Sequence, residues 1–185
     1  MPKDEPAAIA SIDKTTVFEG RVWDVVTDTF DFGGQTLARD YIQHPGAVAV
    51  IAINEKQEIL LIRQYRRPVG TFLWELPAGL RDVAGESPEL AVRRELAEET
   101  GYQAGRVEPL VTFFPSPGGN SEQIHIFWAT DLSEIDYDYE RTGEETDLRP
   151  TWVPLAEAVE SVMASEMQNS IAMLAVLTLA RKLGV

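Results

Sequence analysis

The sequence feature that most constrains this chain is an acid-rich segment with the local signals of a single helix. The segment reads Arg94-Glu95-Leu96-Ala97-Glu98-Glu99-Thr100-Gly101-Tyr102. Upstream, Ser87 suits a helix N-cap and Pro88 suits the first helical position, while Gly101 suits the C-terminal cap. These signals predict a helix that begins at Pro88 and ends at Glu99 or Thr100.

The acidic side chains of this helix are close together in the sequence, and their position needs a physical explanation. At about 100° per residue, Glu95, Glu98 and Glu99 lie within an arc of roughly 100° on one helix face. Like charges one turn apart destabilise a helix by roughly 0.2–0.5 kcal/mol per pair. Hard divalent cations such as magnesium prefer oxygen ligands and would turn this repulsion into coordination. The alternative is a solvated acidic face on which Arg94 pairs with Glu98.

The composition excludes several classes of protein. With 185 residues, of which 44% are hydrophobic, the chain is long enough for one domain with an ordinary core. A formal net charge of −14 would repel a nucleic-acid backbone, so we expect no nucleic-acid partner. The longest apolar runs, residues 47–53 and 171–180, are too short to span a bilayer, so we expect no membrane partner. The absence of cysteine and the polar N-terminus predict a cytoplasmic protein.

Turn signals and β-favouring residues divide the rest of the chain into short elements. We expect strands joined by tight turns over residues 16–43, with a hairpin at Gly33-Gly34. Further strands are expected at residues 47–53 (central and buried), 58–65, 107–114, 123–130 and 151–154, and helices at 154–164 and 168–183. Strands on both sides of the acidic helix, followed by terminal helices, predict an α/β/α sandwich around a mixed β-sheet.

The spacing of the acidic segment resembles the Nudix box, usually written G-x5-E-x7-R-E-U-x-E-E-x-G-U, where U is a bulky aliphatic residue. Glu86 is followed by seven residues and then by Arg94, and every position from Glu86 to Gly101 matches. Two positions depart from the pattern, because six residues separate Gly79 from Glu86 and Tyr102 replaces the last aliphatic. The extra residue lies before the helix and leaves the spacing of the helix glutamates unchanged. The resemblance implies a Nudix-type α+β fold and hydrolysis of a pyrophosphate bond.

In that family the helix glutamates bind magnesium or manganese, and the resemblance implies two or three Mg²⁺ or Mn²⁺ ions here. Carried over by position, the metal ligands would be the Ala78 carbonyl oxygen, Glu95, Glu98 and Glu99. Glu98 and Glu99 would thereby also serve catalysis. Glu86 would support the metal site, and Arg94 would orient a glutamate without touching the substrate.

Segments on either side of the box resemble the ADP-ribose pyrophosphatase branch of the family, especially its actinobacterial members. Residues 63–66 and 74–79 match upstream, and Ser116-Pro117-Gly118-Gly119-Asn120-Ser121-Glu122 matches downstream. The resemblance implies cleavage of a small nucleotide, ADP-ribose or a related ADP-sugar, with AMP and ribose 5-phosphate as the products from ADP-ribose. The residues that bind this substrate would be Trp23, Arg39, Arg66, Ser116 and Glu122. Trp23 would stack on adenine, and the alternative for it is a buried strand aromatic.

The general base of this branch is a glutamate on a loop after the box. The matching segment is Gly143-Glu144-Glu145-Thr146-Asp147, in which Glu145 is the predicted base and Glu144 its alternate. Relatives of this type commonly form homodimers by exchanging N-terminal strands. The resemblance therefore implies a homodimer in which residues 1–43 are an antiparallel β extension for dimerisation and residues 44–185 are the Nudix hydrolase domain.

Two other functions stay open at this level. The chain could be a Nudix hydrolase of another nucleoside diphosphate derivative, such as a nucleotide sugar, a dinucleoside polyphosphate or NADH. It could instead be a Nudix-fold ligand sensor without catalysis, although such proteins typically lack box glutamates that are present here. His44 and His125 are isolated in the sequence, and we expect both to be structural.

Overall fold

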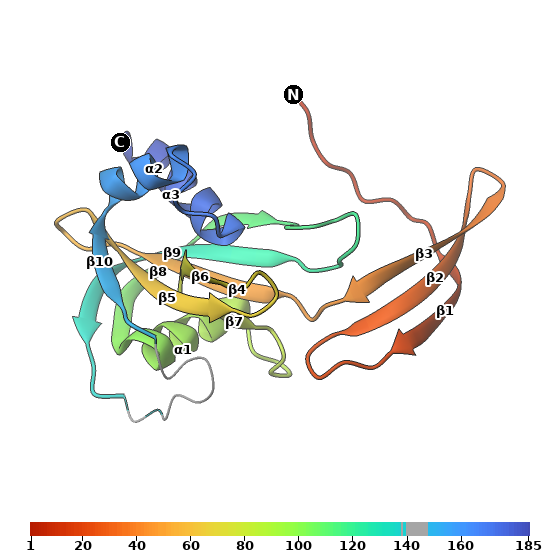
Figure 1. Ribbon diagram of the computed structural model, residues 1–185, viewed down its shortest axis with the longest axis horizontal. Coiled ribbons are helices and arrows are strands. Elements are labelled where there is room, and N and C mark those ends of the chain that lie inside the picture. Colours follow the sequence, from red (N-terminus) through yellow and green to blue (C-terminus); the bar gives the residue numbers. More distant parts are fainter. Residues whose placement is uncertain (138, 140–147) are drawn as a thin grey trace. The chain divides into compact units, whose positions relative to one another are not determined.

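The computed structural model describes residues 1–137, 139 and 148–185, and the chain divides into two compact units (Figure 1). The N-terminal unit comprises Met1–Pro45 together with Ser116–Glu122. The main unit comprises Gly46–Pro115 and Gln123–Val185. The loop Ser116–Glu122 therefore folds with the N-terminal strands, although it is far from them in the sequence.

The N-terminal unit is built on a three-stranded antiparallel sheet in the order β1-β2-β3. Its strands are β1 (Ser11–Phe18), β2 (Asp24–Phe32) and β3 (Gln35–Gln43). Gly33 and Gly34 form the predicted hairpin turn with φ of 64° and 82°, a conformation that glycine adopts without strain. β1 begins at Ser11, ahead of the predicted residue 16, because its pairing with β2 extends back to Ser11 through the polar residues Asp13 and Lys14, which weaken the strand signal there.

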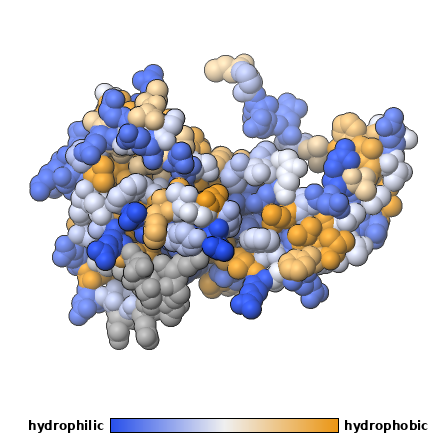
Figure 2. All heavy atoms as spheres, viewed as in Figure 1, coloured by the Kyte–Doolittle hydropathy of each residue, from blue (hydrophilic) through white to orange (hydrophobic). Residues whose placement is uncertain are grey.

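The sheet of the N-terminal unit is largely open to solvent. Every residue of β1 is exposed, and Val26 of β2 is the only buried hydrophobic residue among those described in this unit. The exposed large apolar side chains include Ile12, Val17, Phe18, Trp23 and Phe32. Figure 2 shows hydrophobic patches on this surface. A three-stranded sheet with so small a core is stabilised when another surface covers it.

The main unit contains a four-stranded sheet in the order β7-β4-β9-β8 and a three-stranded sheet in the order β10-β5-β6. The strands are β4 (Ala47–Ala52), β5 (Glu58–Arg66), β6 (Thr71–Glu75), β7 (Ala78–Leu80), β8 (Tyr102–Phe113), β9 (Ile124–Glu134) and β10 (Thr151–Pro154). β4 is buried throughout and pairs in parallel with β9 but antiparallel with β7, so this sheet is mixed, as predicted. β8 begins ahead of the predicted residue 107 because its ladder with β9 extends to the Tyr102–Glu134 pair. β6 and β7 are additional to the expected strands.

The described part of the main unit contains three helices, which are α1 (Pro88–Thr100), α2 (Leu155–Met163) and α3 (Ser170–Leu183). α1 has its predicted ends, because the Ser87 hydroxyl accepts a hydrogen bond from the Leu90 N–H and Gly101 is left-handed with φ of 73°. In Figure 1, α1 lies on one side of the sheets of this unit, and α2 and α3 lie on the other. This layering confirms the predicted α+β fold with its α/β/α sandwich. None of the described helices is both long and apolar enough to cross a bilayer.

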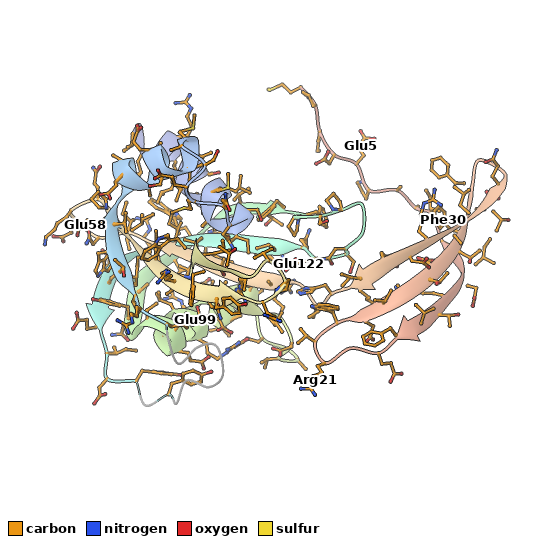
Figure 3. All side chains as sticks on the ribbon, viewed as in Figure 1. Glu5, Arg21, Phe30, Glu58, Glu99 and Glu122 are labelled. Atoms are coloured by element: carbon orange, nitrogen blue, oxygen red, sulfur yellow. The ribbon has the colours of Figure 1, made fainter. Side chains whose placement is uncertain are left out.

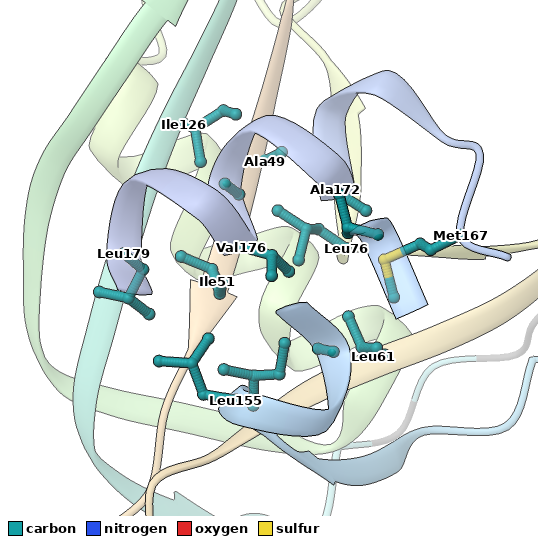
Figure 4. Close-up of a cluster of buried hydrophobic side chains, with 14 of the residues drawn as sticks. Ala49, Ile51, Leu61, Leu76, Ile126, Leu155, Met167, Ala172, Val176 and Leu179 are labelled. Atoms are coloured by element: carbon teal, nitrogen blue, oxygen red, sulfur yellow. The ribbon is translucent and has the colours of Figure 1, made fainter. Parts of the chain in front are cut away.

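Two hydrophobic cores hold the helices against the sheets. One packs α2 and α3 on β4 and β5 through residues such as Ile51, Leu61 and Leu179 (Figure 4). The other packs α1 on the opposite side through residues such as Leu60 and Leu96. Because side chains alternate along a strand, each side chain of β5 faces either α1 or the α2 and α3 layer.

Candidate active site

A single guanidinium, that of Arg94, joins three of the acids that the sequence singled out. It donates hydrogen bonds to Glu86 at 3.0 and 3.1 Å, to Glu95 at 2.6 Å and to Glu98 at 3.1 Å. The contact with Glu98 is the i to i+4 pair that the alternative of a solvated acidic face predicted, whereas Glu86 reaches Arg94 from the loop before the helix. The role of Arg94 in orienting a glutamate stays a prediction.

These contacts shift the pKa of both partners in the direction of the charged form. The hydrogen bond from Arg94 is the main cause that lowers the pKa of Glu86 below its ordinary value, although burial acts in the opposite direction. The same hydrogen bond is the main cause that raises the pKa of Arg94, with further contributions from Glu95 and Glu98. Glu86 and Arg94 therefore carry opposite charges at neutral pH.

Glu95 and Glu99 both lie against the backbone of β7. The Glu99 side chain (labelled in Figure 3) is buried, and its carboxylate accepts a hydrogen bond from the Ala78 N–H at 2.9 Å. The Glu95 carboxylate lies over Gly79, where a Cβ atom would sit only 2.1 Å from the carboxylate carbon and one oxygen. A larger residue at position 79 would therefore displace the Glu95 carboxylate. The structure thus brings two predicted metal ligands beside Ala78, the residue predicted to supply a carbonyl ligand.

The chemistry of the acidic side chains fits a divalent cation. Among the described contacts, the Arg94 guanidinium pairs with Glu86, Glu95 and Glu98, and the Glu99 carboxylate accepts the Ala78 N–H. The side chains of Glu86, Glu95 and Glu98 are 16%, 12% and 15% exposed, so these carboxylates are partly shielded from water. Carboxylate oxygens are the ligands that magnesium and manganese prefer.

The glutamates do not, however, gather around one point. Within the described part of the chain, no three acidic or histidine side chains converge closely enough to hold a metal ion. In this arrangement, Glu86, Glu95 and Glu98 direct oxygen atoms to Arg94. The expected convergence of the helix glutamates is therefore not present in this arrangement, and the ligand set stays a prediction.

Arg66, the predicted phosphate-binding residue of β5, is held by a buried acid that the sequence reasoning missed. Its Nε and Nη2 atoms donate to the two carboxylate oxygens of Glu75 at 2.9 and 2.6 Å. Glu75 is 3% exposed, whereas the Arg66 side chain is 43% exposed. Because Glu75 pairs with Ile62, two residues along β5 from Leu60, this ion pair lies on the α1 face of the sheet. The lone acid within the otherwise apolar run Trp74–Pro77 is the signal that could have revealed it.

Arg39 and the loop Ser116–Glu122 line one cavity within the N-terminal unit. The cavity has a volume of about 450 Å³, and its walls are formed by Phe30, Arg39, Asp40, Tyr41, Pro117, Gly118, Asn120 and Ser121. The Ile42 N–H donates to the Gly119 carbonyl oxygen at 3.0 Å, and the Ser121 N–H donates to the Ile42 carbonyl oxygen at 2.9 Å. These bonds hold the loop against β3 and bring it together with Arg39.

Ser116 and Glu122, two further predicted substrate residues, are the ends of this loop. The Ser116 carbonyl oxygen accepts the N–H groups of Gly119 and Asn120, which closes the turn. The Glu122 carboxylate lies 3.7 Å from the imidazole of His44, whose side chain is 8% exposed. This contact is in keeping with the structural role expected of His44.

Trp23 is 41% exposed, so the alternative of a buried strand aromatic is wrong. The physical reason is that the ladder between β2 and β3 starts at the Asp24–Gln43 pair and leaves residue 23 outside it. Trp23 lines a second cavity of the N-terminal unit, which has a volume of about 420 Å³ and is formed by residues 18–23. An indole in this position is accessible for stacking on a flat ring.

The general base stays a prediction. Glu145 and its alternate Glu144 lie outside the described residues. The other expected structural histidine, His125, has its Nε2 atom 3.3 Å from Arg81 and its Nδ1 atom 3.1 Å from the Thr112 hydroxyl. Burial is the main cause that lowers the pKa of His125, and the charge of Arg81 adds to it. The imidazole is therefore neutral at neutral pH.

The chain is similar to several known proteins over most of its length. The model of one family, the NUDIX domain, matches residues 43–174. The ADP-ribose pyrophosphatase of Mycobacterium tuberculosis (strain ATCC 25618 / H37Rv) is 43% identical over 145 residues, which cover 78% of this chain and 70% of that protein. The ADP-ribose pyrophosphatase of Bacillus subtilis (strain 168) is 34% identical over 161 residues, which cover 86% of each. A crystal structure of an ADP compounds hydrolase has the same fold, with a TM-score of 0.80 at 21% identity over 98% of this chain and 97% of that one.

Proposed function

Since this chain belongs to the NUDIX domain family, we propose that it hydrolyses the pyrophosphate bond of ADP-ribose and releases AMP and ribose 5-phosphate. The family supports the hydrolase activity, and the named relatives support the choice of substrate. The observation that carries the proposal is the position of Glu95 and Glu99 against Ala78 and Gly79. The side chains of a helix that only presented a solvated acidic face would be exposed, whereas the Glu99 carboxylate is buried and accepts the Ala78 N–H.

We assign the metal site to the acids around α1. The ligands of two or three Mg²⁺ or Mn²⁺ ions would be Ala78, Glu95, Glu98 and Glu99. When bound, such ions would supply positive charge that neutralises phosphate oxygens and makes the attacking water easier to deprotonate. Arg94 holds Glu95 and Glu98 by hydrogen bonds, and Glu86 holds Arg94 in turn. Because the carboxylates are held in place before the substrate binds, less conformational entropy is lost when the site assembles.

We assign phosphate binding in the main unit to Arg66. Glu75 fixes its guanidinium through two hydrogen bonds, and the side chain is 43% exposed, so it is accessible to a ligand. A guanidinium held in this way suits paired hydrogen bonds to phosphate oxygens. In the N-terminal unit, the proposed substrate residues are Trp23, Arg39, Ser116 and Glu122. The cavity beside Arg39 and the accessible indole support this assignment.

The proposed chemistry is attack of water on phosphorus. The water oxygen forms a bond to one phosphorus atom, and the bridging P–O bond breaks. Glu145 takes the proton of the attacking water, with Glu144 as the alternate base. This role is proposed from the resemblance of residues 143–147 to the base-bearing loop of the family.

We also propose that the protein is a homodimer, with residues 1–43 as the dimerisation element and residues 44–185 as the hydrolase domain. The exposed apolar side chains of β1, among them Ile12 and Phe18, support this proposal because a second copy would remove them from water. Sedimentation velocity tests it, and a monomer at micromolar concentration would contradict it. The absence of cysteine supports a cytoplasmic location.

A substrate panel tests the proposed function. In the presence of magnesium, the protein should hydrolyse ADP-ribose faster than a nucleotide sugar, a dinucleoside polyphosphate or NADH, and chromatography should detect AMP and ribose 5-phosphate. If ADP-ribose is hydrolysed no faster than another compound of the panel, the proposed substrate is wrong and that compound replaces it. Binding of ADP-ribose without hydrolysis of any compound would support the sensor alternative instead.

The role of the carboxylate cluster needs a separate variant. Glu99→Gln keeps an oxygen that can accept the Ala78 N–H but removes the charge, so the chain should stay folded while hydrolysis falls at least about 100-fold. The matched control is Glu89→Gln, because Glu89 lies on the same helix with a side chain that is 52% exposed. Hydrolysis that survives in Glu99→Gln, or in the presence of a chelator, would overturn the metal site.

A further inference from the structure

The largest cavity described in the main unit is lined by residues to which the proposed function gives no role. It has a volume of about 570 Å³ and is lined by Arg63, Phe72, Trp74, Arg149 and Thr151. These residues belong to β5, β6 and β10 or to the segment directly before β10. Clefts that bind small molecules typically have volumes of about 300–1,000 Å³.

The cavity lies on the face of the sheet that is turned away from α1. Arg63 pairs with Trp74 across the β5–β6 ladder, and Leu61 pairs with Thr151 across the β5–β10 ladder. Because paired residues share a face and alternate residues of a strand return to it, these four side chains lie on one side. Leu61 and Trp74 pack in the core of α2 and α3, whereas Leu60 packs in the core of α1. The cavity is therefore separate from the carboxylate cluster and from the Arg66–Glu75 pair.

The described walls of the cavity are positive, although the chain has a formal net charge of −14. None of the lining residues that the structure describes is acidic. No carboxylate in the described part of the chain forms an ion pair with Arg63 or Arg149. The Arg63 guanidinium instead lies 4.6 Å from the centre of the Phe72 ring. Two arginines at one cavity of an acidic protein, neither in an ion pair with a described carboxylate, favour an anionic ligand.

The lining residues indicate the class of that anion. Guanidinium groups bind phosphate oxygens through paired, charge-assisted hydrogen bonds. The rings of Phe72 and Trp74 provide an apolar wall on which a flat ring can stack. We propose that this cavity is a second ligand site, which binds a phosphate ester with an aromatic ring, of the size of a nucleoside monophosphate. The proposal stands without the proposed hydrolase activity, because none of its residues belongs to the carboxylate cluster.

Titrations followed by NMR test this site residue by residue. Full-length ¹⁵N-labelled protein is titrated with AMP, with adenosine and with ribose 5-phosphate, each with magnesium and with EDTA. AMP should produce saturable shifts of amides in β5, β6 and β10 under both conditions. Adenosine lacks the phosphate and ribose 5-phosphate lacks the aromatic ring, so each should bind at least about tenfold more weakly than AMP.

Two variants that each lose one positive charge distinguish binding at this cavity from a general effect of the net charge of the protein. Arg63→Gln should weaken AMP binding at these strands at least about tenfold. Arg106→Gln removes a charge from the exposed part of β8, where Arg106 pairs with Glu108, and should bind AMP as the unchanged protein does. Amide spectra of both variants should show the fold of the unchanged protein, and Arg149→Gln replaces Arg63→Gln if that variant does not fold.

Three results would overturn the proposal. Shifts confined to α1 and β7 would assign all AMP binding to the carboxylate cluster. Equal weakening by Arg63→Gln and Arg106→Gln would mean that only net charge matters. If none of the three ligands shifted the amides of β5, β6 and β10, and Arg63→Gln changed the dimer dissociation constant, the cavity would be a contact between subunits. A failure of ADP-ribose hydrolysis would leave the NMR result unaffected, so the two proposals fail separately.

Discussion

Replacing Glu75 with glutamine tests whether Arg66 depends on the buried carboxylate that holds it. Glutamine has nearly the same shape as glutamate, so the change leaves no cavity and acts through the hydrogen bonds alone. Arg66 donates to both oxygens of a carboxylate that is 3% exposed, at 2.6 and 2.9 Å. In the variant, the amide oxygen can accept one bond, while the amide nitrogen is a donor that faces another donor.

The expected loss of stability follows from the unequal exposure of the two partners. Removal of one member of a fully buried ion pair costs about 3–5 kcal/mol, because the other charge is left without solvent. The Arg66 side chain is 43% exposed, so water can solvate it when the carboxylate is gone. We therefore expect the free energy of unfolding to fall by about 1.5–3 kcal/mol, the contribution of hydrogen bonds to charged groups. With a urea m-value of about 2 kcal/mol/M, the midpoint should fall by roughly 1 M.

The kinetic effect separates an orienting role from a purely structural one. Loss of a partner that orients a ligand-binding group typically costs about 10- to 100-fold, so kcat/KM for ADP-ribose should fall by about that factor in Glu75→Gln. Steady-state release of AMP and urea unfolding are measured on the same preparation. Glu89→Gln is the control, because it breaks a surface ion pair with Arg93 on α1, in which the Glu89 side chain is 52% exposed, and should change neither quantity. A lower urea midpoint with unchanged kcat/KM would refute the orienting role.

Three further predictions concern the acids of the site. Gly79→Ala places a Cβ atom 2.1 Å from the Glu95 carboxylate and forces this side chain to move, so hydrolysis should fall while circular dichroism still shows a folded chain; full activity would mean that this position of Glu95 has no function. Because Arg94 lowers the pKa of Glu86, their ion pair stabilises the fold above the ordinary pKa of 4.5, and this contribution is lost as the pH falls through the lowered value. Arg94→Gln should therefore flatten the acid side of a plot of urea midpoint against pH, and an unchanged plot would contradict the linkage. Glu145→Gln should lower kcat far more than it changes KM, because a general base acts on the attacking water; steady-state kinetics that show a change in KM alone would make it a binding residue.

The helix α1 could be predicted from the sequence because its signals are local. The serine N-cap, the proline in the first turn and the glycine cap act within a few residues of each helix end. β7 could not be predicted in this way, since the three residues Ala78–Leu80 form a strand through their pairing with β4. The first residues of β8 are strand for a similar reason, because β9 continues opposite them.

The contacts of the candidate site could likewise be predicted only where they are local in the sequence. Helical spacing predicts the contact between Arg94 and Glu98, but the contact with Glu86 spans eight residues and depends on the path of the loop before α1. The Arg66–Glu75 pair depends on the register of β5 on β6, which no local pattern specifies. Sequence reasoning therefore found the acids of the helix, whereas it missed the acid whose partner lies on another strand.

The loop Ser116–Glu122 has a consequence for attempts to recombine this protein with its relatives. Two backbone hydrogen bonds of Ile42, to Gly119 and from Ser121, tie the loop to the end of β3. A chimera that replaced only the first 45 residues would graft foreign strands onto a native loop and put both bonds at risk. Residues 1–45 and 116–122 should instead be exchanged together, because these two segments form one compact unit.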